Sequence, residues 1–151
     1  MGHHGCMELI HGSCVSIDGQ GVLLLGPSGS GKSDLCLRLL DDGAVLVGDD
    51  QLELARRDKA VVAHSPAKLA GLIEVHGFGI LKDVAFSKEA QIKLVVSLVA
   101  EKDIERLPQA EPYLLLDVPL THICLYAFAS STCAKIRAIL KHEALAQDRL
   151  L

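Results

Sequence analysis

The chain contains few aromatic residues and no tryptophan. Phe, Trp and Tyr make up only 3% of its 151 residues, while hydrophobic residues make up 50%. Leucine, valine, isoleucine and alanine must therefore fill the core, and such residues suit buried parallel strands covered by helices. The shortage of aromatic rings also argues against a surface on which nucleic-acid bases stack.

An excess of positive charge and long hydrophobic runs are missing as well. The formal net charge is −4, so general nucleic-acid binding through phosphate neutralisation is not expected. No apolar run approaches the ~20 residues that a membrane span needs, and the N-terminus has no signal-peptide pattern. We therefore predict a protein that binds neither nucleic acid nor membrane.

The cysteines do not form a disulfide or metal-binding pattern. There are five, an odd number, and no two of them form C-x-x-C. Four lie among apolar or small residues, where a free cysteine behaves as a small hydrophobic side chain. We predict reduced thiols in a cytoplasmic protein, and the spacing of the histidines and cysteines predicts no zinc site.

The length of 151 residues and the mass of 16.1 kDa predict a single domain with a proper core. We assign residues 9–151 to this domain, and residues 1–8 to an N-terminal segment that is either disordered or a tag remnant. Hydrophobic patterning predicts strands over 9–17, 22–25, 44–47, 51–55, 60–64, 71–81, 91–99, 113–116 and 123–125, and helices over 32–40 and 130–147. The chain is thus predicted to be mixed α/β, with many strands and few helices.

One segment matches a phosphate-binding motif at all eight positions. It reads Gly26-Pro27-Ser28-Gly29-Ser30-Gly31-Lys32-Ser33, which fits the P-loop pattern G-x-x-x-x-G-K-[ST]. A predicted strand precedes it and a predicted helix follows it, which is the context that gives the motif meaning. The glycines let backbone N–H groups converge on one anion, Lys32 can reach the outer phosphates, and the Ser33 hydroxyl can bind magnesium. The alternative is a glycine-rich turn without function.

Two adjacent acidic residues, Asp49 and Asp50, follow the short strand predicted over 44–47. In a P-loop protein, a carboxylate at such a strand end meets the magnesium or the attacking group. One acid can hold the metal or its water, while the other accepts a proton. The alternative is a solvated turn, in which aspartate is common.

Glu74 lies within an apolar, glycine-containing segment, 71–81, that we read as a strand. A carboxylate buried in such a strand is costly unless it is paired or binds a metal. The glycines at 77 and 79 suggest close approach of the backbone to another group. Functional and structural explanations for Glu74 both remain open on these grounds.

Taken together, these stretches resemble HPr kinase/phosphorylase, a bacterial serine kinase family of the sugar phosphotransferase system. The resemblance rests on His11-Gly12, the P-loop, Val47-Gly48-Asp49-Asp50, and residues 72–80, which are similar to the family's L-E-I-R-G-L-G-I signature. It covers residues 9–84. The resemblance implies a P-loop NTPase-like, PEP-carboxykinase-like α/β fold with a mixed β-sheet and flanking helices.

The resemblance also implies roles for individual residues. Lys32 and the loop amides would hold the phosphates of ATP, and Ser33 and Glu74 would bind Mg²⁺. Asp50 would be the catalytic acid/base that deprotonates the target serine, supported by Asp49, and His11 would lie near the nucleotide phosphates. Without the resemblance, His11 reads as an ordinary strand histidine. The implied protein substrate is an HPr-like carrier, and the implied assembly is a homo-oligomer, a hexamer.

The chain departs from the family pattern at several positions. His76 stands in place of the signature arginine, which removes a permanent positive charge. The usual loop with a catalytic arginine after Val84 is missing, and the Pro- and Arg-rich segment linked to dephosphorylation has no match around 116–122. The phosphorylase half of the activity therefore stays open. So do two other functions: a non-catalytic sensor of ATP or ADP, and a P-loop kinase of a small metabolite.

Overall fold

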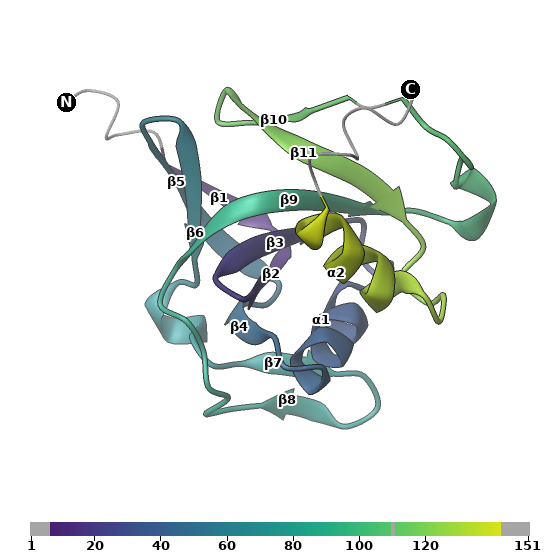
Figure 1. The fold of residues 1–151 in the computed structure, drawn as a ribbon. Helices are drawn as coiled ribbons and strands as arrows, with labels where there is room; N and C mark the ends of the chain where they lie inside the picture. The colour runs from purple at the N-terminus through teal and green to yellow at the C-terminus, as the bar shows by residue number, and fades with distance from the viewer. Residues whose placement is uncertain (1–6, 110, 143–151) are drawn as a thin grey trace.

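The computed structural model describes residues 7–109 and 111–142 (Figure 1). Within these residues the strands are β1 (Met7–His11), β2 (Ser13–Ile17), β3 (Gln20–Leu25), β4 (Val45–Gly48), β5 (Gln51–Arg57), β6 (Ala60–His64), β7 (Ile73–Val75), β8 (Gly79–Leu81), β9 (Ala90–Leu98), β10 (Tyr113–Leu115) and β11 (Val118–Leu125). The helices are α1 (Lys32–Asp41) and α2 (Thr132–Lys141), with 3₁₀ turns η2 (Ala67–Leu69) and η3 (Glu101–Asp103). The predicted mixed α/β class is confirmed.

Nine strands form one curled sheet. The order along its main path is β1-β5-β6-β9-β3-β2-β4, with β11 beside β9 and β10 beside β11. The strands β3, β9 and β11 run parallel to one another, whereas the remaining pairs are antiparallel. Because parallel strands carry their carboxyl ends to the same edge, this edge is where a ligand site is expected.

The strand predicted over 9–17 is wrong as a single element. It divides at Gly12 into β1, which pairs with β5, and β2, which pairs with β3 and β4. A Cβ atom at Gly12 would lie 3.1 Å from the carbonyl oxygen of Leu24, so the chain passes close to β3 as it changes partners. β1 begins at Met7, two residues before the predicted start of the domain. Residues 1–6 lie outside the described part of the chain.

Residues with positive φ form the turn between β2 and β3 and end the helix α1. Asp18 and Gly19 form the two-residue turn between β2 and β3 and have positive φ angles of 50° and 82°, as a tight hairpin turn requires. Gly43, with φ 102°, follows the last residues of α1 and donates its N–H to the carbonyl oxygen of Leu40 at 3.0 Å. A glycine in this conformation ends the helix without strain.

Apolar side chains pack on both faces of the sheet. On one face, Leu24 and Val96 lie with the buried side chains of both helices, which include Leu35, Leu39, Ile136 and Leu140. Both helices cover this side of the sheet in Figure 1. On the other face, Leu23 and Val95 pack with residues of β5, β6 and β11. The alternation along β3 and β9 therefore places successive residues in two cores.

The C-terminal helix was predicted over 130–147 and is described from Thr132 to Lys141. Its apolar residues Ile136 and Leu140 are buried, and Ile139 packs against the same core. The remaining predicted residues, 143–147, lie outside the described part of the chain. None of the described helices is long and apolar enough to span a membrane.

The segment 71–81 is not one strand. It forms a small separate hairpin, β7–β8, in which Glu74 pairs with Ile80, and it lies below α1 in Figure 1. Ile73 is buried with the residues of α1, whereas Phe78 and Ile80 are 77% and 67% exposed. Glycines at 77 and 79, both with positive φ, reverse the chain direction, which the apolar composition alone did not indicate.

The four described cysteines are free thiols, as predicted; Cys14 and Cys36 are buried, whereas Cys124 is exposed. Burial raises the pKa of the Cys14 thiol to about 12. This thiol is therefore protonated at neutral pH and contributes as a small apolar core residue. Cys6 lies outside the described residues.

Candidate functional site

The P-loop connects β3 to the first turn of α1. Gly29 and Gly31 have φ angles of 83° and 99°, which only glycine adopts without strain. Gly31 precedes α1, and no side chain caps the N-terminus of this helix. Its first backbone N–H groups are therefore free to bind an anion, and the helix dipole favours negative charge at this end.

The Lys32 side chain folds back over the start of the P-loop. Its Nζ atom donates to the carbonyl oxygens of Gly26 at 2.5 Å and Pro27 at 3.2 Å. The ammonium group therefore lies beside the first residues of the P-loop, close to where a phosphate would bind. The hydroxyl of Ser30 is buried without a hydrogen-bond partner. Such groups are rare in folded proteins, and a phosphate oxygen would provide the missing partner.

Asp49 is the centre of a buried hydrogen-bond network at the end of β4. Its side chain is 7% exposed and accepts hydrogen bonds from Ser13 Oγ at 2.7 Å and from Ser33 Oγ at 2.9 and 3.1 Å. The backbone N–H of Glu74 donates to the same carboxylate at 3.1 Å. Asp49 thus joins β2, α1 and β7, and hydrogen bonds of this kind are what a buried carboxylate requires.

Asp50 is exposed, although it is adjacent to Asp49. Its φ angle is 72°, a left-handed conformation that aspartate and asparagine tolerate better than other side chains. Its backbone carbonyl accepts the N–H of Gly12 at 2.9 Å, and its backbone N–H lies 3.4 Å from Ser13 Oγ. The backbone of Asp50 is therefore fixed while its carboxylate faces solvent, as a group that accepts a proton from a substrate requires.

Glu74 differs from the prediction. Its side chain is exposed, not buried within an apolar strand, so it carries no burial cost that a metal must offset. Its contribution to the network is the backbone N–H that holds Asp49. His11 is exposed at the end of β1 and reaches the site through its neighbour Gly12, which binds Asp50.

Two groups of this site, the hydroxyls of Ser13 and Ser30, were not predicted from the sequence. Ser13 is fully buried and donates to Asp49; the signal in the sequence was a serine at the start of a largely apolar strand. Ser30 was recognised only as a P-loop position, although its hydroxyl is buried and unpaired. The role of Ser13 could not be predicted from its neighbours in the chain, because it depends on a contact with Asp49 on another segment.

The residues around Asp49 fit a magnesium ion bound together with a nucleotide. Within the described part of the chain, no three His, Cys, Asp or Glu side chains form a metal cage. Magnesium usually takes one or two carboxylates together with substrate phosphates and water. The Ser33 hydroxyl and the Asp49 carboxylate, 2.9 Å apart, provide that kind of partial set at the end of the P-loop.

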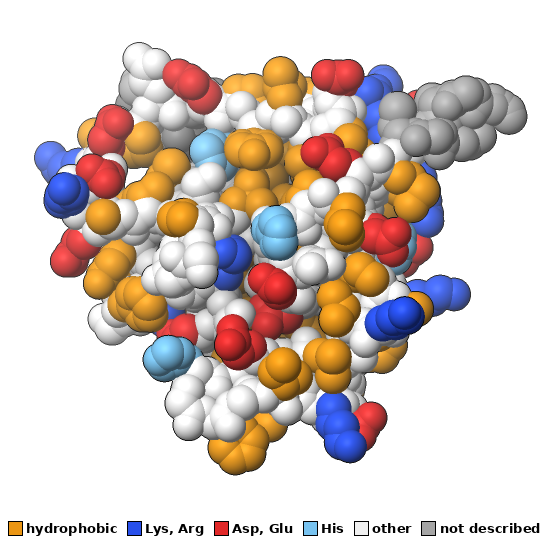
Figure 2. Space-filling view, turned by 180° about the vertical axis from the view of Figure 1, so that it is seen from behind, with side chains coloured by type: hydrophobic (Ala, Val, Ile, Leu, Met, Phe, Trp, Pro, Cys, Tyr) orange, Lys and Arg blue, Asp and Glu red, His pale blue; other side chains and the backbone are white. Residues whose placement is uncertain are grey.

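The face in Figure 2 carries acidic side chains near its centre, with a basic and a histidine side chain close by. Most of the Lys and Arg side chains on this face lie toward its edges.

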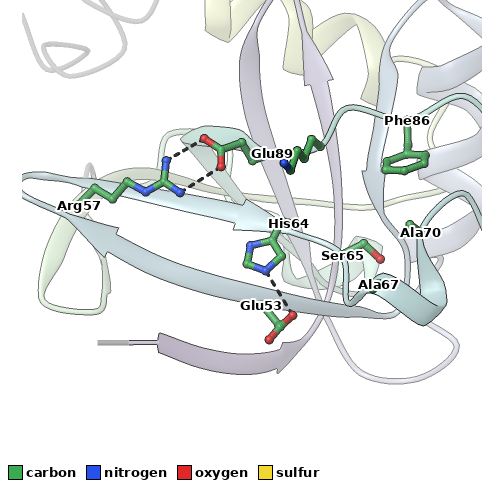
Figure 3. A pocket seen from close by; sticks show the side chains of 9 residues that line it. Glu53, Arg57, His64, Ser65, Ala67, Ala70, Phe86 and Glu89 are labelled. Carbon is green, nitrogen blue, oxygen red and sulfur yellow. Dashed lines mark hydrogen bonds and ion pairs between the residues drawn. The ribbon is translucent and has the colours of Figure 1, made fainter. Parts of the chain in front are cut away.

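A pocket of about 730 Å³ lies where β5 and β6 meet η2 and the segment before β9 (Figure 3). Its charged side chains are largely paired: Arg57 contacts Glu89 at 2.8 Å, and His64 contacts Glu53 at 3.2 Å. The hydrogen bond from Arg57 lowers the pKa of Glu89. Arg57 and Glu89 thus neutralise each other's charge, and no P-loop residue lines this pocket.

Comparison with known proteins gives a consistent result. The family model "HPr Serine kinase C-terminal domain" matches residues 5–146. An HPr kinase/phosphorylase of Bordetella pertussis is 36% identical over 136 residues, which cover 83% of this chain and 44% of that protein. One from Verminephrobacter eiseniae is 34% identical over 145 residues, which cover 87% of this chain and 45% of that protein. The chain thus spans less than half the length of these curated relatives.

The fold has a solved counterpart. The structure titled "Structure of the Hpr(Ser) kinase/phosphatase from Coxiella burnetii" matches with a TM-score of 0.80 and 25% sequence identity, covering 95% of this chain and 94% of that one. This match confirms the predicted P-loop-type fold. With the P-loop and the Asp49 network at the carboxyl edge of its sheet, the chain belongs to the HPr serine kinase C-terminal domain family.

Proposed function

We propose that this chain is an ATP-dependent serine protein kinase that acts on an HPr-like phosphocarrier and uses Mg²⁺. The observation that carries the proposal is the contact of Ser33 with Asp49, directly beside an uncapped helix N-terminus and next to the exposed Asp50. A cradle for phosphates, a partial magnesium set and a free carboxylate then lie within one site, as phosphoryl transfer requires.

In this proposal the residues divide the work. The loop amides and Lys32 bind the β- and γ-phosphates, and Ser33 and Asp49 hold the metal. Magnesium supplies neutralisation of phosphate charge and alignment of the triphosphate. Asp50 accepts the proton of the target serine as its oxygen attacks the γ-phosphorus and ADP leaves. Catalysis then rests on positioning and electrostatic stabilisation.

Two further residues have auxiliary roles in the proposal. Glu74 is a second carboxylate for the metal, since magnesium takes one or two, and its exposed side chain lies on the hairpin whose backbone binds Asp49. His11 lies near the phosphates through its position beside Gly12. In the reverse, phosphorylase reaction, Asp50 would protonate the serine oxygen as inorganic phosphate attacks phosphoserine.

The proposed setting is the cytoplasm, where the four free cysteines would remain reduced. We also propose that the chain works as a homo-oligomer, a hexamer by analogy with its family. Exposed apolar residues at the molecule's edges, Met7 and Leu9 on β1 and Leu114 on β10, are compatible with contacts between copies.

The test is incubation of the purified chain with labelled ATP, Mg²⁺ and HPr from the same organism. The proposal predicts phosphoserine on HPr, and loss of all incorporation in Lys32→Ala. Addition of inorganic phosphate and phospho-HPr to the same protein tests the phosphorylase half. A folded chain that binds ATP but gives no phosphoserine on HPr contradicts the kinase assignment.

One observation favours a second candidate, a non-catalytic sensor of ATP or ADP. His76 stands in place of the signature arginine. Only lysines follow in the region where the family has a catalytic arginine: Lys82, Lys88 and Lys93. Nucleotide binding without transfer would support this sensor. Label appearing in a small molecule, instead of in a protein, would support a metabolite kinase.

A further inference from the structure

The segment that follows β11 lies beside the P-loop. Strands β3, β9 and β11 are parallel neighbours, so the P-loop after β3 and residues 126–129 after β11 leave the sheet at the same edge. Ligands of open α/β sheets bind at this edge. A nucleotide whose phosphates lie at the N-terminus of α1 must therefore place the rest of its structure among the loops found there.

Phe128 is in direct contact with the last glycine of the P-loop. A Cβ atom at Gly31 would lie 2.7 Å from Ala127 Cβ and 2.8 Å from Phe128 Cζ. Only a glycine at position 31 leaves room for this ring. Despite that contact, Phe128 remains 52% exposed, so one part of the ring touches the loop and another is open to a ligand.

The position of this ring is fixed by its surroundings. Thr132 Oγ1 donates to the carbonyl oxygen of Tyr126 at 2.6 Å, and the Arg38 guanidinium on α1 donates to the carbonyl oxygen of Ala127. Ala127 is fully buried. The Tyr126 and Phe128 rings meet edge to face, with centroids 5.7 Å apart and planes at 72°, a favourable aromatic geometry.

We infer that Phe128, supported by Tyr126, packs against the base of the nucleotide whose phosphates the P-loop holds. The inference rests on the proposed function, because it needs a nucleotide in the loop. A rigid aromatic ring with an exposed surface binds a base through stacking, which every base can supply. The contact therefore adds affinity without selecting adenine over guanine.

The experiment compares ligands with and without a base by titration calorimetry, each with Mg²⁺: ADP, GDP and pyrophosphate. Phe128→Ala should weaken ADP and GDP binding equally, by roughly 5- to 150-fold, the range found for base–aromatic stacking. Pyrophosphate affinity should change less than about twofold, because it has no base. Phe128→Tyr, which keeps the ring, should bind ADP nearly as well as the unmodified chain does.

Phe78→Ala is the matched control, because Phe78 is also an exposed phenylalanine, 77% exposed, but lies on the β7–β8 hairpin. It should leave ADP affinity unchanged. An equal loss of ADP and pyrophosphate in Phe128→Ala would overturn the inference and show that the ring only supports the loop; unchanged ADP affinity would overturn it too. If the unmodified chain binds none of the three ligands, the proposed function itself fails.

Discussion

Two regions around the P-loop differ sharply in how they are held. The first, here called the buried anchor, is Asp49 with the hydroxyls of Ser13 and Ser33 and the N–H of Glu74. The second, here called the exposed rim, is Asp50 and the hairpin β7–β8, whose side chains at 74, 78 and 80 are exposed. In the anchor, three elements donate hydrogen bonds to the Asp49 carboxylate. In the rim, the side chains of Asp50 and of residues 74, 78 and 80 face solvent.

The difference indicates that the buried anchor and the exposed rim have separate roles. A buried network that joins three elements fixes the geometry of the metal and phosphate end. Exposed groups cannot supply that rigidity, but they can reach a second protein. Substitutions in the rim should therefore affect transfer to a protein substrate, while substitutions in the anchor should affect folding and nucleotide binding first.

The largest effect expected in the rim comes from Asp50→Asn. The amide keeps the left-handed backbone acceptable but cannot accept a proton, so transfer to HPr should fall by roughly 10²- to 10⁴-fold while nucleotide affinity is retained. Phosphoserine formation and calorimetry measure the two quantities. Asp58→Asn is the matched control, since Asp58 is also exposed and has a φ of 59°. Unchanged turnover in Asp50→Asn would refute its role as base.

Ile73→Ala tests how the rim is attached to the anchor. Ile73 is 1% exposed and packs in the core with α1, so its truncation should lower the free energy of unfolding by about 2–5 kcal/mol. Ile80→Ala on the same hairpin, where the side chain is 67% exposed, should change it by less than about 0.5 kcal/mol. Similar losses for the two variants, measured by denaturant unfolding, would contradict this view of the hairpin.

The smallest of these effects is expected for Ser13→Ala in the anchor. Its hydroxyl is fully buried and donates to Asp49 at 2.7 Å, and loss of a hydrogen bond to a charged group costs about 1.5–3 kcal/mol. Ser16→Ala, at a half-buried position on the same strand, provides the comparison. If Ser13→Ala proves as harmless as Ser16→Ala, Asp49 does not depend on the network described here.

The local parts of this site could be predicted from the sequence. The P-loop and the acidic pair depend on short segments whose strand, glycines and helix are adjacent in the chain, and α1 formed where the patterning predicted a helix. The predictions that were wrong concern segments whose structure depends on contacts with residues far away in the chain. The division at Gly12 follows from strand pairing with β5 and β3, which residue patterns within 9–17 cannot indicate.

For the same reason, the sequence could not predict that Glu74 is exposed or that Phe128 contacts Gly31. An apolar run with two glycines fits either one buried strand or a hairpin, and only the pairing of β7 with β8 decides between them. Phe128 lies 97 residues beyond Gly31 in the chain. Its position follows from the parallel arrangement of β3, β9 and β11.

The most direct test of the account is the magnesium dependence of ATP binding, measured by calorimetry in the unmodified chain, in Ser33→Thr and in Ser33→Ala. The first two have a hydroxyl beside Asp49 and should bind ATP more tightly with Mg²⁺ than without it. Ser33→Ala should lose most of that gain, because the hydroxyl that meets Asp49 at 2.9 Å is gone. A folded, unmodified chain that takes up no magnesium–nucleoside triphosphate, or a Ser33→Ala variant with undiminished magnesium dependence, would contradict the account.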